Sequence, residues 1–181
     1  MQDKPVDLHD LLRRFLAVDV VNGSVLRNQE RGVVGAIQKE LAEVDIGNVP
    51  SGSITEYKAW LDKKTSMILD ALKVKNRPWG TVRKALNLFM RACICNVYLR
   101  KQCDLQKIEA LAEIPLDGIV ANALKRQAGR GILPTWPYLK NLKSMDNDYF
   151  QGFALKHAKE RGLPARVYLD NLLWLENRKR K

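Results

Sequence analysis

The sequence predicts an all-α protein, a compact bundle of about seven or eight helices in one domain. Apolar residues recur at the three- and four-residue spacing of amphipathic helices, and no segment shows the alternation of a strand. Proline, glycine and Asn/Asp breaks separate these helical segments. With 181 residues, 46% of them hydrophobic, the chain is long enough to bury a core without disulfides or a structural metal.

Three helices are expected in the first 75 residues. The first runs from Asp7 to Val21, and the Asp7 side chain is a suitable N-cap. The second runs from about Gln29 to Val44. The third runs from Ser53 to Lys75 and opens on Ser53-Ile54-Thr55-Glu56, which fits a capping box.

A helix from Pro78 to Lys101 is the clearest element of the sequence. Proline suits the first turn of a helix because its missing N–H would have no partner there. Apolar residues fill most of the helical circumference, a pattern typical of a central, buried helix. The remaining polar strip contains no acid and includes Arg83, Lys84, Asn87 and Arg91.

Shorter helices are expected in the rest of the chain. One is delimited by Asp117, a suitable N-cap, and Gly129, a suitable C-terminal stop. Another is expected over Asp104–Glu113, and at most a short helix over Tyr138–Leu142. The last two are expected from Asp146 or Asn147 to Arg161, and from Pro164 onward with Trp174 facing inward.

The net charge of +11 lies entirely in the second part of the chain. Residues 1–75 contain 11 Lys/Arg and 11 Asp/Glu, which leaves 20 Lys/Arg and 9 Asp/Glu for residues 76–181. We therefore distinguish a neutral part, 1–75, and a basic part, 76–181, within what we expect to be one compact domain. Such an asymmetry indicates a polyanionic partner such as nucleic acid, although cations on a solvated surface would give the same count.

The polar strip of the central helix is the first candidate site. Arg83, Asn87 and Arg91 follow one another at i, i+4 and i+8 and therefore share one helix face, with Lys84 beside them. Guanidinium groups bind phosphate oxygens in a bidentate way, and an Asn amide can bond a base edge or a phosphate. The same strip could instead form internal ion pairs with the nearby acids Glu109, Glu113 and Asp117.

Two further groups of cations follow. The loop around Trp136 is flanked by Lys125, Arg126, Arg130, Lys140 and Lys143. An indole among cations can stack on a base, but Trp136 can equally anchor the loop in the core, which is the interpretation we favour. The basic tail at the end of the last helix either binds phosphate or complements the helix dipole, and it consists of Arg178, Lys179, Arg180 and Lys181.

The cysteines and the missing motifs exclude several function classes. Cys93, Cys95 and Cys103 lack zinc-ligand spacing, and we interpret them as reduced, buried, apolar side chains of a cytoplasmic protein. The chain shows no signal-peptide layout and no apolar run long enough to cross a membrane. Because phosphate-loop, dinucleotide and nucleophile-elbow motifs are also missing, we assign no catalytic residue, metal site or cofactor.

One enzyme hypothesis comes from a resemblance at scattered positions. Leu133-Pro134, then Lys140 or Lys143, then Asp170 follow in the order seen in helical DNA glycosylases, in which a Lys, or a water activated by an Asp, follows a Leu-Pro hairpin. Thr135 and Trp136 stand where that hairpin has glycines, and the spacing to Asp170 is longer. The resemblance implies a DNA-repair type enzyme as an alternative function. Without it, Asp170 is interpreted as a surface or capping residue.

The sequence as a whole predicts a protein that binds DNA or RNA through a basic face of residues 76–181, mainly by contacts to phosphates. The first alternative is a non-enzymatic subunit or adaptor of a protein complex, with residues 1–75 as a possible protein-contact surface. An exposed apolar patch on the first three helices would favour that alternative. The DNA-repair type enzyme is the third hypothesis.

Overall fold

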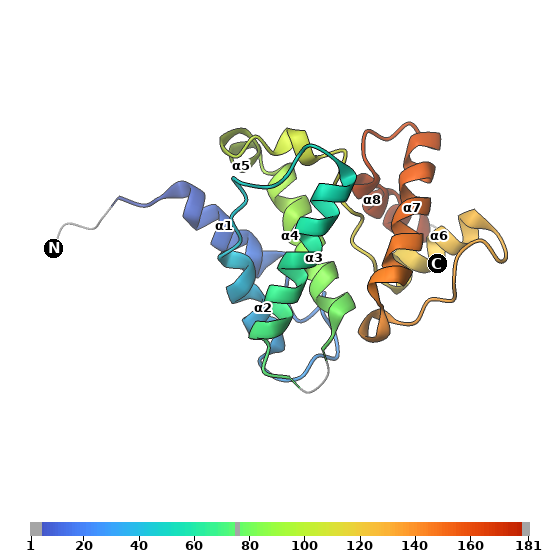
Figure 1. Ribbon diagram of the computed structural model, residues 1–181, viewed down its shortest axis with the longest axis horizontal. Coiled ribbons are helices and arrows are strands. Elements are labelled where there is room, and N and C mark those ends of the chain that lie inside the picture. Colours follow the sequence, from blue (N-terminus) through green and yellow to red (C-terminus); the bar gives the residue numbers. More distant parts are fainter. Residues whose placement is uncertain (1–4, 75–76, 179–181) are drawn as a thin grey trace.

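The computed structural model describes residues 5–74 and 77–178 (Figure 1). Every regular element in these ranges is a helix, which confirms the predicted all-α class. The α-helices are α1 (Leu8–Asp19), α2 (Val33–Ala42), α3 (Ile54–Ala71), α4 (Trp79–Cys95), α5 (Val97–Gln102), α6 (Gly118–Ala128), α7 (Ser144–Glu160) and α8 (Leu169–Arg178). Three short 3₁₀ helices are interspersed, η1 (Leu105–Ile108), η2 (Leu139–Asn141) and η3 (Arg166–Tyr168).

The predicted starts of several helices are confirmed by their caps. The Asp7 carboxylate accepts hydrogen bonds from the backbone N–H groups of His9 and Asp10 at the start of α1. The Ser53 hydroxyl accepts from the N–H of Glu56 at the start of α3, and the Asp117 carboxylate accepts from the first turn of α6. Each cap satisfies backbone donors that have no partner inside the helix, so these short polar side chains fix where each helix begins.

The predicted central helix is shorter than expected. α4 ends at Cys95, and α5 follows after a break at Asn96, whereas the sequence predicted one helix to Lys101. Asn96 has an extended backbone, and its side chain accepts the N–H of Leu99. The break arises because a short amide side chain offers the backbone this local alternative to helix continuation.

Three other expected helices also differ from the structure. The segment Asp104–Glu113 forms only η1, because Asp104 takes a left-handed backbone with φ of 52° that ends regular helix. α7 begins at Ser144, before the expected caps, and Asp146 lies inside its first turn, where its carboxylate accepts the N–H of Lys143. The chain after Pro164 first forms η3, so α8 begins only at Leu169.

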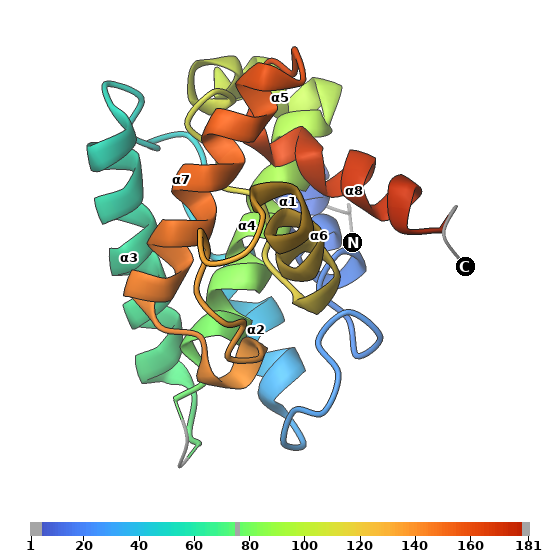
Figure 2. The same cartoon turned by 90° about the vertical axis from the view of Figure 1, so that its right-hand side faces the viewer.

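The core consists of two hydrophobic clusters. The first joins α1–α5, η1 and the side chains of Ala165 and Val167, and the second joins α6–α8 with Trp136 and Leu142. Figure 1 shows the first group of helices on the left and α6–α8 on the right, and Figure 2 shows α6 between α7 and α8. Along the chain, the boundary between the two clusters lies near residue 113, whereas the boundary between the neutral and the basic part lies near residue 75. The basic part of the chain therefore contributes α4 and α5 to the first cluster.

Gly80 allows the two clusters to approach each other. A Cβ atom at this position of α4 would overlap the carbonyl oxygen of Leu139 and would lie 2.7 Å from the Cβ of Leu142. Trp79 beside it packs against both clusters. A glycine is required here because the backbone of η2 lies directly against the helix. In the described ranges, no helix has both the length and the apolar character needed to cross a membrane.

Candidate nucleic-acid interface

The polar strip of α4 turns toward the protein's own acids. The Arg83 side chain is 1% exposed, and its Nε and Nη2 atoms lie 2.9 and 3.0 Å from the two carboxylate oxygens of Glu113. Its Nη1 atom lies 3.0 Å from Asp62 and 3.2 Å from the Thr65 hydroxyl. This bidentate geometry is the strong form of an Arg–carboxylate pair, and it occupies the donors of Arg83 inside the protein.

Glu113 connects several helices through its buried carboxylate. Besides Arg83, it accepts hydrogen bonds from Asn87 at 3.0 Å and Asn147 at 3.4 Å. Burial by itself would raise the pKa of Glu113, but attraction and hydrogen bonding to Arg83, together with the charge of Arg166 and the Asn87 bond, hold it below its ordinary value. Glu113 is therefore a carboxylate at neutral pH, and it links α4 to α7.

Two predicted interface residues are therefore corrected. Arg83 and Asn87 are buried and bonded to Glu113, so their side chains do not reach the surface where a phosphate or a base would lie. Of the two interpretations that the sequence left open for the strip, the internal partner applies to these residues. Glu109, the other acid weighed for this role, instead contacts Arg100 and the Tyr168 hydroxyl.

Lys84 and Arg91 also have internal partners, but both border a groove. The Lys84 ammonium lies 3.2 Å from the Asp117 carboxylate and donates a hydrogen bond to the Val25 carbonyl oxygen. Arg91 forms an ion pair with Asp170 and lies 3.3 Å from the Asn171 side-chain oxygen. Asp170 lies 79 residues after Arg91 in the sequence, and it is none of the acids Glu109, Glu113 and Asp117 that were expected to pair with the strip.

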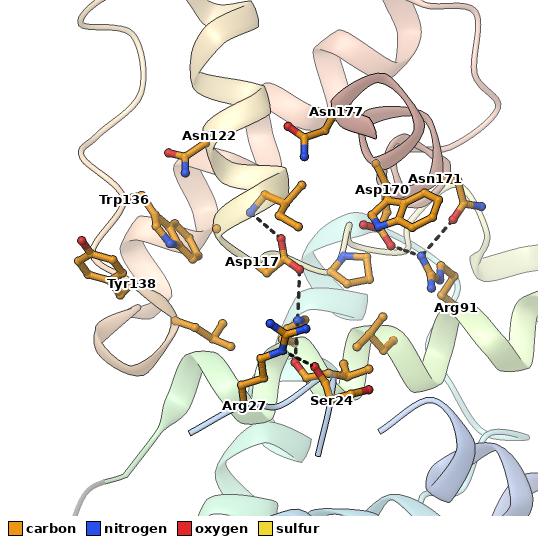
Figure 3. Close-up of a pocket in the computed structure, with 18 of the residues that line it drawn as sticks. Ser24, Arg27, Arg91, Asp117, Asn122, Trp136, Tyr138, Asp170, Asn171 and Asn177 are labelled. Atoms are coloured by element: carbon orange, nitrogen blue, oxygen red, sulfur yellow. Dashed lines mark hydrogen bonds and ion pairs between the residues drawn. The ribbon is translucent and has the colours of Figure 1, made fainter. Parts of the chain in front are cut away.

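The groove lies where α4, α6 and α8 meet and has a volume of about 1170 Å³ (Figure 3). The loop before η2 and the segment 24–27 complete its walls. Figure 3 shows Trp136 and Tyr138 together at one end, Arg91, Asp170 and Asn171 at the other, and Asp117 between them. Lys84, Arg91, Asp117 and Asp170 are thus arranged as two ion pairs that line the groove.

Aromatic side chains line the groove to different depths. Trp136 is buried and meets Phe150 edge to face, with ring centroids 5.5 Å apart, which confirms the favoured prediction of a core role. Tyr138 is 71% exposed at the rim. Trp174 on α8 is 45% exposed and lines the groove, contrary to the expectation that it faces inward. Two exposed aromatic side chains, Tyr138 and Trp174, therefore border the groove.

The pKa of Asp170 is raised above its ordinary value. Burial is the main cause, and the charge of Asp117 adds to it, while Arg91 and Lys84 act in the opposite direction. The two carboxylates lower the net positive charge of the groove, which Arg27, Lys84, Arg91 and Arg126 supply. The groove is consequently only mildly basic, and each of its two acids belongs to an ion pair.

A basic depression adjoins the groove. It is formed by the end of α6 and the following loop, has a volume of about 730 Å³ and shares Asn122 and Arg126 with the groove. Lys125 and Arg130 also line it. Within residues 5–74 and 77–178, Lys125, Arg126 and Arg130 form no ion pair with a carboxylate. These three predicted residues are brought together, and their charges are available at one surface.

The remaining predicted cations lie elsewhere or are not described. Lys140 and Lys143 are exposed but line neither the groove nor the depression, and Lys143 precedes the first turn of α7. The guanidinium of Arg178 lies 4.7 Å from the ring centre of Trp174. Lys179, Arg180 and Lys181 lie outside the described residues. Of the residues in the DNA glycosylase resemblance, Asp170 lines the groove and the two lysines do not.

Sequence reasoning missed several residues that the groove brings together. Arg27 comes from the neutral part of the chain, and Asn122, Asn177 and Tyr138 were not selected as site residues. Tyr138 had one local indicator, its place after Pro137 and between the predicted cations Arg130 and Lys140. The others become neighbours only through tertiary packing.

The cysteines differ in burial, and α1 has an exposed apolar face. All three cysteines are free; Cys93 is buried as predicted, with a pKa raised by burial, whereas Cys95 is exposed because it is the last residue of α4. α1 exposes an apolar stripe, the patch on which the adaptor alternative depends. The stripe has the spacing of one helix face and consists of Leu8, Leu11, Phe15 and Val18.

No family model, curated protein or solved structure matches this chain. The functional proposal is therefore built on the groove, the depression and their charges alone.

Proposed function

We propose that the protein binds nucleic acid along a surface formed by the groove and the basic depression. The observation that supports this most directly is their continuity through Asn122 and Arg126. One side of this surface offers cations without a carboxylate partner among the described residues, and the other offers exposed aromatic rings and side-chain amides. Nucleic-acid interfaces combine these two kinds of group, since cations bind phosphates while rings and amides meet bases.

The depression suits the phosphate backbone. Arg126 and Arg130 are exposed, Lys125 is partly exposed, and Gly129 and Gly131 have positive φ values of 85° and 81°. These glycines place no side chain on either side of Arg130, so a backbone phosphate can come close to the three cations. Contacts of this kind supply affinity without sequence preference.

The groove suits bases. Asn122, Asn171 and Asn177 offer amide donors and acceptors, and Tyr138 and Trp174 offer ring faces. The ion pairs of Lys84 and Arg91 keep the acidic residues of the groove partnered, so that their carboxylates do not face a polyanion as free charges. The proposal therefore assigns phosphates to the depression and bases to the groove.

The salt dependence of binding tests the role of the depression. We expect K125Q/R126Q/R130Q to bind a fluorescent 20-nucleotide strand more weakly than the wild type at low salt. The slope of log Kobs against log salt should become shallower by about 2, because roughly 0.7 counterions are released for each phosphate of a single strand. Fluorescence anisotropy between low and moderate salt measures both quantities.

The matched control is K39Q/K63Q/K73Q, which removes the same charge from exposed positions on α2, in the middle of α3 and just beyond its end. Because none of the three lysines lines the groove or the depression, this variant should leave the salt slope close to that of the wild type. Equal losses in the two triple variants would show that only the net charge matters and would contradict the proposed surface. Absence of binding by the wild type at low salt would overturn the proposed function.

The raised pKa of Asp170 predicts a pH dependence of the same binding reaction. As the pH falls through this pKa, protonation removes a negative charge from the groove, so affinity for the strand should increase. D170N should bind several-fold more tightly at neutral pH, of the order of 1 kcal/mol, and should lose this part of the pH dependence. Anisotropy titrations from pH 7 down to pH 3.8, the ordinary pKa of an aspartate side chain, provide the measurement. D19N, at the exposed end of α1, is the charge-matched control and should behave as the wild type.

A further inference from the structure

We infer that the groove takes an unpaired nucleotide, whose base stacks on Tyr138, so that the ligand is single-stranded rather than duplex nucleic acid. This inference rests on the proposed function and adds the strandedness of the ligand. It is based on the backbone of Tyr138, the exposure of its ring, and the anchors on both sides of it.

Tyr138 has an unfavourable backbone conformation. Its φ of 63° and ψ of 152° lie in a region that glycine enters readily and that a bulky L-residue avoids. The ring is 71% exposed, so burial of the side chain does not offset this cost. A glycine would fit the backbone better and would lose little packing. The tyrosine at this position is therefore unexplained by folding.

The neighbouring residues fix Tyr138 in this conformation. Two residues before it, Trp136 is buried against Phe150. One residue after it, the carbonyl of Leu139 lies against Gly80 of α4. The Tyr138 carbonyl itself accepts the N–H of Asn141 at 3.1 Å. Because the chain is held at both ends of so short a segment, the Tyr138 ring is positioned at the rim of the groove before any ligand arrives.

The surroundings of the ring fit a base. Figure 3 places Tyr138 next to Trp136 at the end of the groove, with Asn122 nearby. Asn122 also borders the depression, whose cations have no carboxylate partner in the described part of the chain, so phosphates bound there would lie beside the ring. In a duplex the base faces are covered by their neighbours in the stack, and only an unpaired base presents a face to an aromatic ring. A duplex could use the cations but not Tyr138.

The test compares a 20-nucleotide single strand with the duplex of the same sequence. We expect the wild type to prefer the single strand. Y138G should bind the single strand roughly 5- to 150-fold more weakly, the range equivalent to about 1–3 kcal/mol of stacking on one base. Its affinity for duplex should stay within about twofold of the wild type. Y138F keeps the ring and should bind as the wild type does.

A stability measurement separates this role from a structural one. Because glycine suits the backbone of residue 138, the Tm of Y138G should equal or exceed that of the wild type while single-strand binding falls. Y149A removes an exposed ring from α7, outside the groove, and should change neither quantity. In a strand containing 2-aminopurine, the wild type should quench the base fluorescence more strongly than Y138G does.

Each of the other possible results would overturn either this inference or the proposed function. Equal binding of single strand and duplex by the wild type, or unchanged single-strand binding by Y138G, would overturn the inference and leave the proposed function standing. A Tm of Y138G several degrees below that of the wild type would also overturn it, since Tyr138 would then have a structural role. If the wild type binds neither oligonucleotide at low salt, the proposed function fails and the inference fails with it.

Discussion

Replacement of Glu113 with alanine is expected to lower the free energy of unfolding by about 3–5 kcal/mol, the usual cost of removing one partner of a buried ion pair. The change leaves the Arg83 guanidinium buried, with its Nε and Nη2 donors deprived of their acceptors. Asp62 would remain on Nη1, but it is 38% exposed and shares its charge with water and Lys58. Urea denaturation followed by far-UV circular dichroism measures the loss.

The double variant R83M/E113L distinguishes an unpaired charge from lost packing. It removes both charges and fills the space with apolar side chains of similar size, so it should be more stable than E113A. The coupling energy from R83M, E113L and the double variant should be at least 1 kcal/mol. Strictly additive effects would show that Arg83 and Glu113 do not depend on each other and would contradict the network.

The same carboxylate should make stability sensitive to acid. The pKa of Glu113 is below its ordinary value of 4.5, so its contribution is fully present above that pH and is lost as the pH falls through the lowered pKa. The midpoint of urea unfolding should therefore fall on acidification below pH 4.5 more steeply for the wild type than for E113Q. Identical pH profiles of the two proteins would contradict the assigned pKa shift.

Local sequence patterns predicted where helices begin better than they predicted which side chains contact one another. The caps at Asp7, Ser53 and Asp117 depend on residues within one helical turn, and all three are present. Helical spacing also identified the polar strip of α4, but it did not decide whether the strip contacts a ligand or the protein's own acids. Arg83 and Glu113 are 30 residues apart in the sequence, and the segment that contains Glu113 was expected to be helical. Whether the two meet depends on how that irregular segment turns back, which no local pattern specifies.

The groove could not be predicted from the sequence for a similar reason. Its lining comes from five stretches of chain, which lie within 24–27, 84–91, 115–126, 136–139 and 170–177. The charge count placed the basic surface in residues 76–181, and Lys125, Arg126 and Arg130 do lie together in the depression. It missed Arg27, because that residue belongs to a part with no net charge, and it included Arg83, because a count does not distinguish a buried cation from an exposed one.

Gly80 is the position where a single methyl group should affect both stability and binding. G80A is expected to lose about 1–3 kcal/mol of stability, the range for overpacking a close contact, because its Cβ would overlap the Leu139 carbonyl oxygen. The contact is with backbone, so η2 must move away from α4 to relieve it. That movement releases one of the two anchors of Tyr138. G80A should therefore also weaken single-strand binding.

G152A is the matched control for this substitution. Gly152 lies inside α7 with no atom close to an added Cβ, so alanine there should raise stability by up to about 1 kcal/mol through helix propensity. The two variants make the same chemical change in a helix but should shift the urea midpoint in opposite directions. If G80A were as stable as G152A, η2 could move at no cost, and the rigid placement of Tyr138 would lose its structural basis. If G80A lost stability but bound the strand as the wild type does, the anchor at Gly80 would serve the fold alone, and Trp136 would be sufficient to hold the tyrosine ring.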